Sequence, residues 1–177
     1  MMHPDGVQYR LATPLTIEPM RKRDIKAVLA IEEQVYPRPW SAALFQSELA
    51  LDETRCYLVA RCERKVVGYG GLMMALSDGH ITTVAVDPTQ RRRGIARHIM
   101  LALCRDAVGR GAEALTLEVR MGNRAAQELY RRFAFVPVGV RKDYYDFPTG
   151  REDALVMWAH DVAKPEYAAL LEALERR

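Results

Sequence analysis

Apolar residues follow two different spacings along this chain, and each spacing predicts one kind of element. Short runs rich in apolar and β-branched residues predict strands. These runs lie at residues 15–20, 56–61, 66–76, 80–86, 114–119, 135–141 and 154–160. In longer runs the apolar residues recur at three- and four-residue spacing, which predicts helices. These runs lie at residues 25–36, 42–51, 95–109, 124–133 and 165–177.

Capping and turn-forming residues separate the predicted elements. Asp24 and Ser41 precede the first two helical runs, so we expect each of them to cap the helix that follows. The prolines at positions 37 and 39 end the first helix, and residues 63–65 join two strand-like runs as a hairpin. Because hairpins imply antiparallel neighbours within a chain that also alternates strands and helices, we expect a mixed sheet.

Together these elements predict an α/β (α+β) fold. Its centre is a mixed, mostly antiparallel twisted sheet of six to seven strands, flanked by about four helices and followed by a C-terminal helix. A chain of 177 residues with 49% hydrophobic residues is long enough to bury one substantial core. We therefore expect a loose lead at residues 1–14, one domain at 15–160 and a C-terminal helical extension at 161–177.

Composition narrows the functional class. The net charge of +3 is small and concentrated in a few arginine pairs and triplets, which makes a nucleic-acid partner unlikely. The three cysteines show no CxxC spacing and the four histidines show no ligand spacing, so we expect neither a disulfide framework nor a metal site. Without an apolar leader or a membrane-length apolar run, the sequence predicts a cytoplasmic protein that does not contact a membrane.

Candidate chemistry begins at residues 91–96, which read Arg-Arg-Arg-Gly-Ile-Ala and lie between a predicted strand and a predicted helix. Unpaired N–H groups and the positive end of the helix dipole suit a phosphate at such a position. Gly94 lets the backbone approach a ligand, and arginines grip phosphate oxygens through two parallel hydrogen bonds. The turn predicts an anionic cofactor; the alternative is a solvated turn that caps an ordinary helix.

This run resembles the cofactor motif Arg/Gln-x-x-Gly-x-Gly/Ala of the GNAT superfamily of acyl-CoA-dependent N-acetyltransferases, and it fits every defined position. Residues 83–88 look like the strand whose backbone pairs with the pantetheine arm in that family. The resemblance implies acetyl-CoA as cosubstrate and no metal. It also implies a set of cofactor-binding residues, namely Val84, Ala85, Val86, Arg91, Arg92, Arg93, Gly94, Ile95, Ala96, Arg97 and Asn123.

Later runs narrow the resemblance, which covers residues 15–160. They lie at residues 117–120, 123, 129–130, 143–145 and 150–154. In this order they look like the bacterial RimI-type enzymes, which acetylate the N-terminal alanine of a small-subunit ribosomal protein. The resemblance implies transfer of acetyl to the N-terminal α-amine of a protein by direct attack in a ternary complex. The substrate it favours most is the N-terminal alanine of the eighteenth small-subunit ribosomal protein. Acetylation of a lysine or a small amine, and a non-catalytic CoA-binding module, remain alternatives.

Two residues are candidates for proton transfer. Glu118 lies at the end of a predicted strand, and alternation puts its side chain on the face opposite to Leu117 and Val119. We expect a partly dry cleft there to raise the pKa of Glu118. It could then act as a general base, directly or through a water. Tyr130 is a phenol that can protonate the leaving thiolate. The resemblance assigns Glu118 the same role. The alternatives are a surface glutamate and a core tyrosine.

The remaining candidate residues are expected to face the substrate. Glu32 lies on the apolar stripe of the first helix, and we expect it, with Tyr36, to meet a polar or cationic substrate group unless it reaches solvent or an arginine. Tyr144 and Tyr145 resemble the family loop that closes over the peptide. Because adjacent residues of an extended segment point to opposite sides, we expect at most one of them to contact substrate directly. The alternative is a tyrosine pair that only stabilises a hairpin.

Two positions differ from the family. Ala134 replaces a glycine, which costs about 1 kcal/mol if the backbone there is left-handed. Arg38 replaces an aromatic residue before Pro-Trp, a difference that bears on substrate preference.

Asn123 also suits a helix N-cap, a role compatible with cofactor binding.

Overall fold

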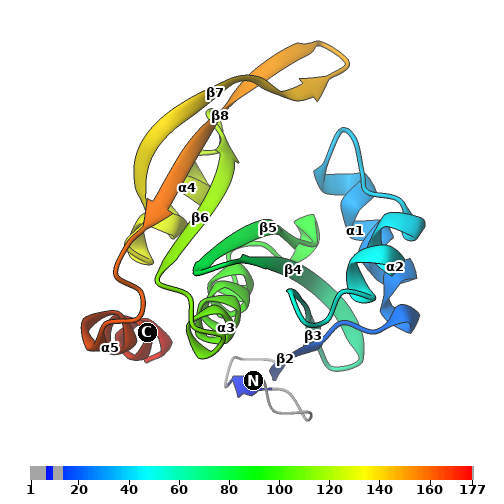
Figure 1. The fold of residues 1–177 in the computed structure, drawn as a ribbon. Coiled ribbons are helices and arrows are strands. Elements are labelled where there is room, and N and C mark those ends of the chain that lie inside the picture. Colours follow the sequence, from blue (N-terminus) through cyan, green and yellow to red (C-terminus); the bar gives the residue numbers. More distant parts are fainter. Residues whose placement is uncertain (1–6, 10–13, 177) are drawn as a thin grey trace.

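The computed structural model describes residues 7–9 and 14–176 (Figure 1). Eight strands form one sheet in the order β1-β2-β3-β4-β5-β6-β8-β7, in which β5 and β6 are parallel and all other neighbours are antiparallel. The strands are β1 (Val7–Tyr9), β2 (Leu15–Pro19), β3 (Arg55–Cys62), β4 (Lys65–Ala75), β5 (Asp78–Val86), β6 (Ala114–Arg120), β7 (Val136–Phe147) and β8 (Gly150–Ala159). The helices are α1 (Ile25–Val35), α2 (Ala42–Leu49), α3 (Ile95–Gly109), α4 (Arg124–Arg132) and α5 (Pro165–Glu175), with short 3-10 turns η1 (Lys22–Asp24) and η2 (Pro88–Gln90).

Helices cover both faces of the sheet. Both faces of strand β3 are apolar, so each face needs a covering layer. On one face, Leu58 and Ala60 pack in the core cluster that contains α3. On the other face, Tyr57 and Val59 pack in the cluster that contains α1 and α2. The helix α5 packs against α3 and extends the first cluster (Figure 1). The sheet is therefore a middle layer, with α3 on one face and α1 and α2 on the other.

The strand β4 lets α3 approach closely. A Cβ atom on Gly70 would lie 2.6 Å from Cγ2 of Ile99 on α3, which is too short for any real side chain. Glycine at this position therefore fixes the distance between the sheet and the helix that follows the arginine turn.

The parallel pair β5 and β6 is joined for only part of its length. Its register runs from Asp78 opposite Ala114 to Ile81 opposite Leu117. Beyond these residues the two strands diverge, as Figure 1 shows. Consequently, no strand among the described residues pairs with the second half of β5 on the edge that faces β6.

The structure confirms the predicted fold class and adds detail. A short eighth strand, β1, lies in the segment expected to be a loose lead; the rest of that lead, residues 1–6 and 10–13, lies outside the described residues, as does Arg177. The strands β7 and β8 extend well past the predicted limits of 141 and 154 and form one long hairpin. The division into lead, domain and extension stays a prediction.

One of the two expected helix caps is wrong. Ser41 accepts the N–H of Leu44 at 3.1 Å and caps α2, as predicted. Asp24 makes no side-chain cap for α1, because it accepts the N–H of Arg21 at 2.9 Å and ends the preceding 3-10 turn. Its other oxygen accepts a hydrogen bond from Arg61 at 2.6 Å, so Asp24 ties the start of α1 to β3.

Candidate active site

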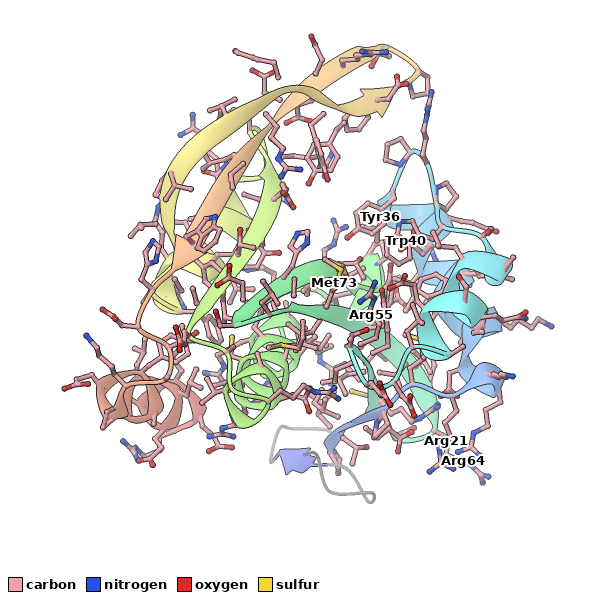
Figure 2. The ribbon with its side chains drawn as sticks, viewed as in Figure 1. Arg21, Tyr36, Trp40, Arg55, Arg64 and Met73 are labelled. Atoms are coloured by element: carbon pink, nitrogen blue, oxygen red, sulfur yellow. The ribbon has the colours of Figure 1, made fainter. Side chains whose placement is uncertain are left out.

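The central cavity lies between the α1–α2 side of the molecule and the strands β6 and β7, and its volume is about 630 Å³. Tyr36 and Trp40, which follow α1, line one wall, and Arg55 from β3 and Met73 from β4 line its inner end. Figure 2 shows these four labelled side chains gathered beside β4 and β5. The opposite wall contains Glu118 on β6.

A second cavity, the arginine groove, has a volume of about 930 Å³ and follows the start of α3 and one side of α4. It shares part of its lining with the central cavity, including Val84 on β5, Asn123 before α4 and Tyr130 on α4. A long molecule bound in the groove therefore reaches the central cavity where these three residues meet.

The arginine turn has the geometry of an anion site. Gly94 adopts a left-handed conformation (φ 75°) and is the N-cap of α3, so the first N–H groups of the helix are turned toward the groove. The side chains of Arg91, Arg92 and Arg93 are exposed around it. Nε of Arg97 is buried without a hydrogen-bond partner, and this residue lines the groove as well. An unpartnered buried donor beside a helix N-terminus fits a phosphate-bearing ligand.

The free edge of β5 supplies backbone groups where the two cavities meet. The hydroxyl of Tyr36 donates to the carbonyl of Val84 at 3.2 Å and lies 3.2 Å from Oγ1 of Thr83. The N–H and C=O of one residue in a strand point to the same edge, so the N–H of Val84 faces the same gap. The carbonyl and N–H of Val84 therefore lie on the edge of β5 that has no strand neighbour among the described residues.

Glu118 is partly buried, with 7% of its side chain exposed, and both of its oxygens have partners. Oε2 lies 2.7 Å from Nε2 of His80, and Oε1 lies 3.2 Å from Nη1 of Arg141. The hydrogen bond to His80 outweighs burial and, with the charge of Arg141, lowers the pKa of Glu118. The expected raised pKa is therefore wrong, because the sequence did not reveal these partners.

Tyr130 is 8% exposed and lines both cavities. Its ring contacts Phe135, with centroids 6.1 Å apart, and burial raises its pKa, so the hydroxyl keeps its proton at neutral pH. Asn123 caps α4 by accepting the N–H of Ala126 at 3.2 Å, as predicted. Ala134 has φ 62°, which confirms the left-handed backbone after α4.

Glu32 is also buried, with 1% of its surface exposed. It reaches neither solvent nor an arginine: Oε2 accepts the N–H of Trp40 at 3.1 Å, and Oε1 accepts the hydroxyl of Tyr69. Burial raises the pKa of Glu32 and these neutral donors only partly offset it. Glu32 lines the central cavity, so its contact with substrate stays a prediction.

The two adjacent tyrosines do not point to opposite sides. Asp143 before them has φ 52°, and the register of β7 against β8 shifts between Arg141 and Tyr145. The bulge brings the rings of Tyr144 and Tyr145 into an edge-to-face contact at 5.1 Å, and both line the central cavity. The hydroxyl of Tyr145 donates to the backbone carbonyl of Glu118 at 3.2 Å.

The same hairpin reaches across the cavity to the α1–α2 loop. Nη2 of Arg38 lies 2.6 Å from Oδ2 of Asp146, and both residues line the cavity. Figure 1 shows the tip of the β7–β8 hairpin approaching this loop. An ion pair thus joins the two walls at the position where the sequence departs from the family pattern.

Sequence reasoning missed His80 and Arg141 as members of the site. The histidines show no ligand spacing along the sequence, but His80 lies opposite Thr116 in the parallel register, and Glu118 follows two residues later on the same face of β6. The proximity of His80 to Glu118 follows from the pairing of β5 with β6, which the local sequence pattern does not reveal. Among the described residues no cluster of three or more His, Cys, Asp or Glu side chains is placed to hold a metal ion.

A basic groove at a helix N-terminus that joins a cavity containing a carboxylate defines an enzyme that uses an anionic cosubstrate and acts on a second molecule. The model of the acetyltransferase (GNAT) family matches residues 25–135, and the chain belongs to this family. It is an acetyltransferase with acetyl-CoA as its cosubstrate. No helix among the described residues is long and apolar enough to cross a membrane.

Relatives support this assignment. A Bacillus subtilis (strain 168) protein, provisionally named a ribosomal protein bS18-alanine N-acetyltransferase, is 34% identical over 151 residues, 84% of this chain and 97% of its own length. The ribosomal-protein-S18-alanine N-acetyltransferase of Escherichia coli has a crystal structure that matches with a TM-score of 0.76 and 30% identity, covering 83% of this chain and 94% of that one. Arabidopsis thaliana NAA60 in complex with acetyl-CoA shares the fold, with a TM-score of 0.75 at 18% identity over 82% of this chain and 98% of that one.

Proposed function

We propose that this enzyme transfers the acetyl group of acetyl-CoA to the N-terminal α-amine of a protein, with the N-terminal alanine of ribosomal protein bS18 as its expected substrate. The names of the Bacillus subtilis and Escherichia coli relatives support this substrate. The observation that carries the reaction is the junction of the two cavities at Val84 and Tyr130. There an amine from one cavity meets a thioester from the other.

The arginine groove is the proposed site of acetyl-CoA. Arg91, Arg92 and Arg93 supply cationic donors for phosphate oxygens, and the N-terminus of α3 at Gly94 supplies N–H groups. The unpartnered Nε of Arg97 gives a further donor. We propose that the carboxyl half of β5, from Val84 to Val86, pairs with the pantetheine arm; the absence of a neighbouring strand on that edge among the described residues supports this.

Acetyl-CoA supplies the thioester carbonyl that is attacked and the thiolate that leaves. A protein α-amine has an ordinary pKa of about 8, so much of it is protonated at neutral pH and must lose a proton before it attacks. We assign this proton transfer to Glu118, acting directly or through a neighbour or water. The N–H of Val84 is placed to stabilise the negative oxygen of the tetrahedral intermediate, and Tyr130 protonates the thiolate.

The central cavity is the proposed site of the peptide N-terminus. Tyr36, Tyr144 and Tyr145 line it with amphipathic rings that accept a short side chain and a backbone at once. Glu32 is proposed to act on the peptide through the loop that it fixes. The enzyme is proposed to work in the cytoplasm; its three cysteines are free and buried, as in a reducing compartment.

The decisive experiment gives the purified protein acetyl-CoA and one of three acceptors. These are a peptide with a free N-terminal alanine, an N-blocked peptide with an internal lysine, and a polyamine. Release of CoA thiol and peptide mass are measured. We expect acetylation of the free-alanine peptide alone, because the Bacillus subtilis and Escherichia coli relatives are named as alanine N-acetyltransferases.

Two variants make this experiment specific. Glu118→Gln is expected to lower kcat by about 10²–10⁴-fold, the usual contribution of a general base. Glu166→Gln, an exposed position on α5, is the matched control and should keep wild-type activity. Turnover of the lysine peptide or polyamine alone would replace the proposed acceptor, and acetyl-CoA binding without turnover would indicate a binding module.

A further inference from the structure

His80 and Glu118 form a carboxylate–imidazole pair inside the central cavity. Nε2 of His80 lies 2.7 Å from Oε2 of Glu118, a distance at which one proton must lie between the two atoms. Both residues line the cavity, but 26% of the His80 side chain is exposed against 7% for Glu118. The imidazole is therefore the more accessible member of the pair.

The pairing decides which atom can take a proton. With Nε2–H donating to the carboxylate, the neutral ring keeps its lone pair on Nδ1. Glu118 itself is a weak proton acceptor at neutral pH, because His80 and Arg141 lower its pKa below the ordinary 4.5. A carboxylate that orients an imidazole and balances the imidazolium is the arrangement that activates the base in Ser-His-Asp enzymes.

Other charged and titratable groups around the pair do not take over this role. Arg141 and Tyr145 from β7 hold Oε1 and the backbone carbonyl of Glu118. Arg55 from β3 is paired with Glu48 at 2.8 Å. On β4 the residue opposite His80 is Met73, which does not titrate. Among the groups named here, His80 is thus the partly exposed imidazole that contacts the carboxylate and lines the cavity.

We infer that His80 is a second catalytic residue of the proposed reaction: its imidazole accepts the proton that leaves the substrate ammonium, while Glu118 orients the ring and balances its charge. This inference rests on the proposed function and changes Glu118 from a sole base into one member of a pair. The role differs from that of a structural histidine, which would only donate to Glu118.

The proton balance is complete without a further reactant. One N–H bond of the ammonium breaks, its electron pair stays on nitrogen, and the proton moves to Nδ1 of His80, directly or through one water. The nitrogen then bonds to the thioester carbon, and the C–S bond breaks as Tyr130 gives its hydroxyl proton to the thiolate. A second N–H proton is released from the nitrogen and Tyr130 is reprotonated, while His80 returns its proton to solvent.

The test compares wild-type enzyme with His80→Gln on the free-alanine peptide between about pH 6 and 9, the range in which imidazoles and α-amines titrate. Glutamine can still donate to Glu118 but cannot take a proton. We expect kcat at pH 7 to fall by about 10²-fold or more, with KM for peptide and acetyl-CoA nearly unchanged. The deficit should shrink as pH rises toward 9, because the amine then loses its proton to solvent.

His160→Gln is the control, since this exposed histidine stacks on Trp158 outside the cavity. Thermal unfolding and acetyl-CoA affinity show whether each variant is folded. A His80→Gln enzyme with near-wild-type kcat, or with the same deficit at every pH, would overturn the inference and leave His80 as a positioning residue.

Different results would contradict the proposed function and the role of His80. Wild-type turnover of the polyamine or lysine peptide alone would replace the acceptor, and the same pH comparison on that acceptor still decides the role of His80. No turnover by wild-type enzyme on any amine would overturn both proposals.

Discussion

Two glutamates, one buried and one partly buried, line opposite walls of the central cavity, and their surroundings move their pKa values in opposite directions. Glu32 meets only neutral donors, so burial dominates and its pKa is raised. Glu118 meets an imidazole and a guanidinium, so these partners dominate and its pKa is lowered. Burial alone therefore does not identify a catalytic carboxylate; the charge of the groups around it does.

The difference separates structural from chemical roles. Glu32 joins α1 to the backbone of Trp40 and to Tyr69 on β4, so it fixes one wall of the cavity. Glu118 contacts His80 on the lining of the same cavity, and we propose that it takes part in proton transfer. Glu32 thus fixes one wall of the cavity, and the other wall carries the pair proposed to react.

The largest expected contrast is in stability. Glu32→Gln presents one donor and one acceptor to two groups that both donate, so the free energy of unfolding should fall by about 1–3 kcal/mol. Denaturant unfolding measures this loss. The peptide KM should also rise more than the acetyl-CoA KM, because Glu32 holds the α1–α2 loop.

Glu118→Gln is the matched comparison and should be less destabilising, since its site is open to the cavity. If the Glu118 variant lost as much stability as the Glu32 variant, the distinction between a structural and a chemical carboxylate would be wrong. An equal effect of Glu32→Gln on both substrates would remove its proposed role at the peptide site.

The second contrast is the sign of the pH dependence. A raised folded-state pKa means that Glu32 contributes most stability below its ordinary pKa of 4.5, and the contribution is lost as pH rises through the folded-state value. Glu118 has the opposite sign: its contribution is present above 4.5 and is lost as pH falls through its lowered value.

Unfolding free energies of wild type and the two glutamine variants, measured from acid to neutral pH, test this contrast. The difference between wild type and Glu32→Gln should decrease as pH rises, and the difference for Glu118→Gln should decrease as pH falls. Parallel curves for the two variants would show that the partners do not control the two pKa values.

The smallest expected effect concerns the ion pair that joins the walls. Arg38 is 75% exposed, and such pairs contribute about 0.2–1 kcal/mol. We expect this pair to restrict peptide entry by joining the walls, so Arg38→Ala should raise kcat/KM for peptide by up to about fivefold without changing acetyl-CoA affinity. Added salt should raise the wild-type value toward that of the variant.

Lys164→Ala removes another exposed ion pair, with Asp161 at 3.1 Å, and serves as the control. It should leave kcat/KM unchanged. A decrease of kcat/KM in Arg38→Ala would mean that Arg38 contacts the peptide itself rather than closing the cavity.

Local patterns predicted most of the fold. Apolar spacing located the helices and strands, and capping chemistry located the starts of α2 and α4, because these signals depend on residues a few positions apart. The arginine turn was recognisable for the same reason, since its glycine, its cations and the following helix are consecutive.

Tertiary structure decided the rest of the site. The pairing of β5 with β6 brought His80 to Glu118, 38 residues away, and so reversed the expected direction of the Glu118 pKa. A bulge in β7 placed Tyr144 and Tyr145 on one wall. The sequence by itself determined the elements, the family resemblance and the candidate residues, whereas partners, charge balance and proton affinity depended on contacts between distant segments, which only the folded chain creates.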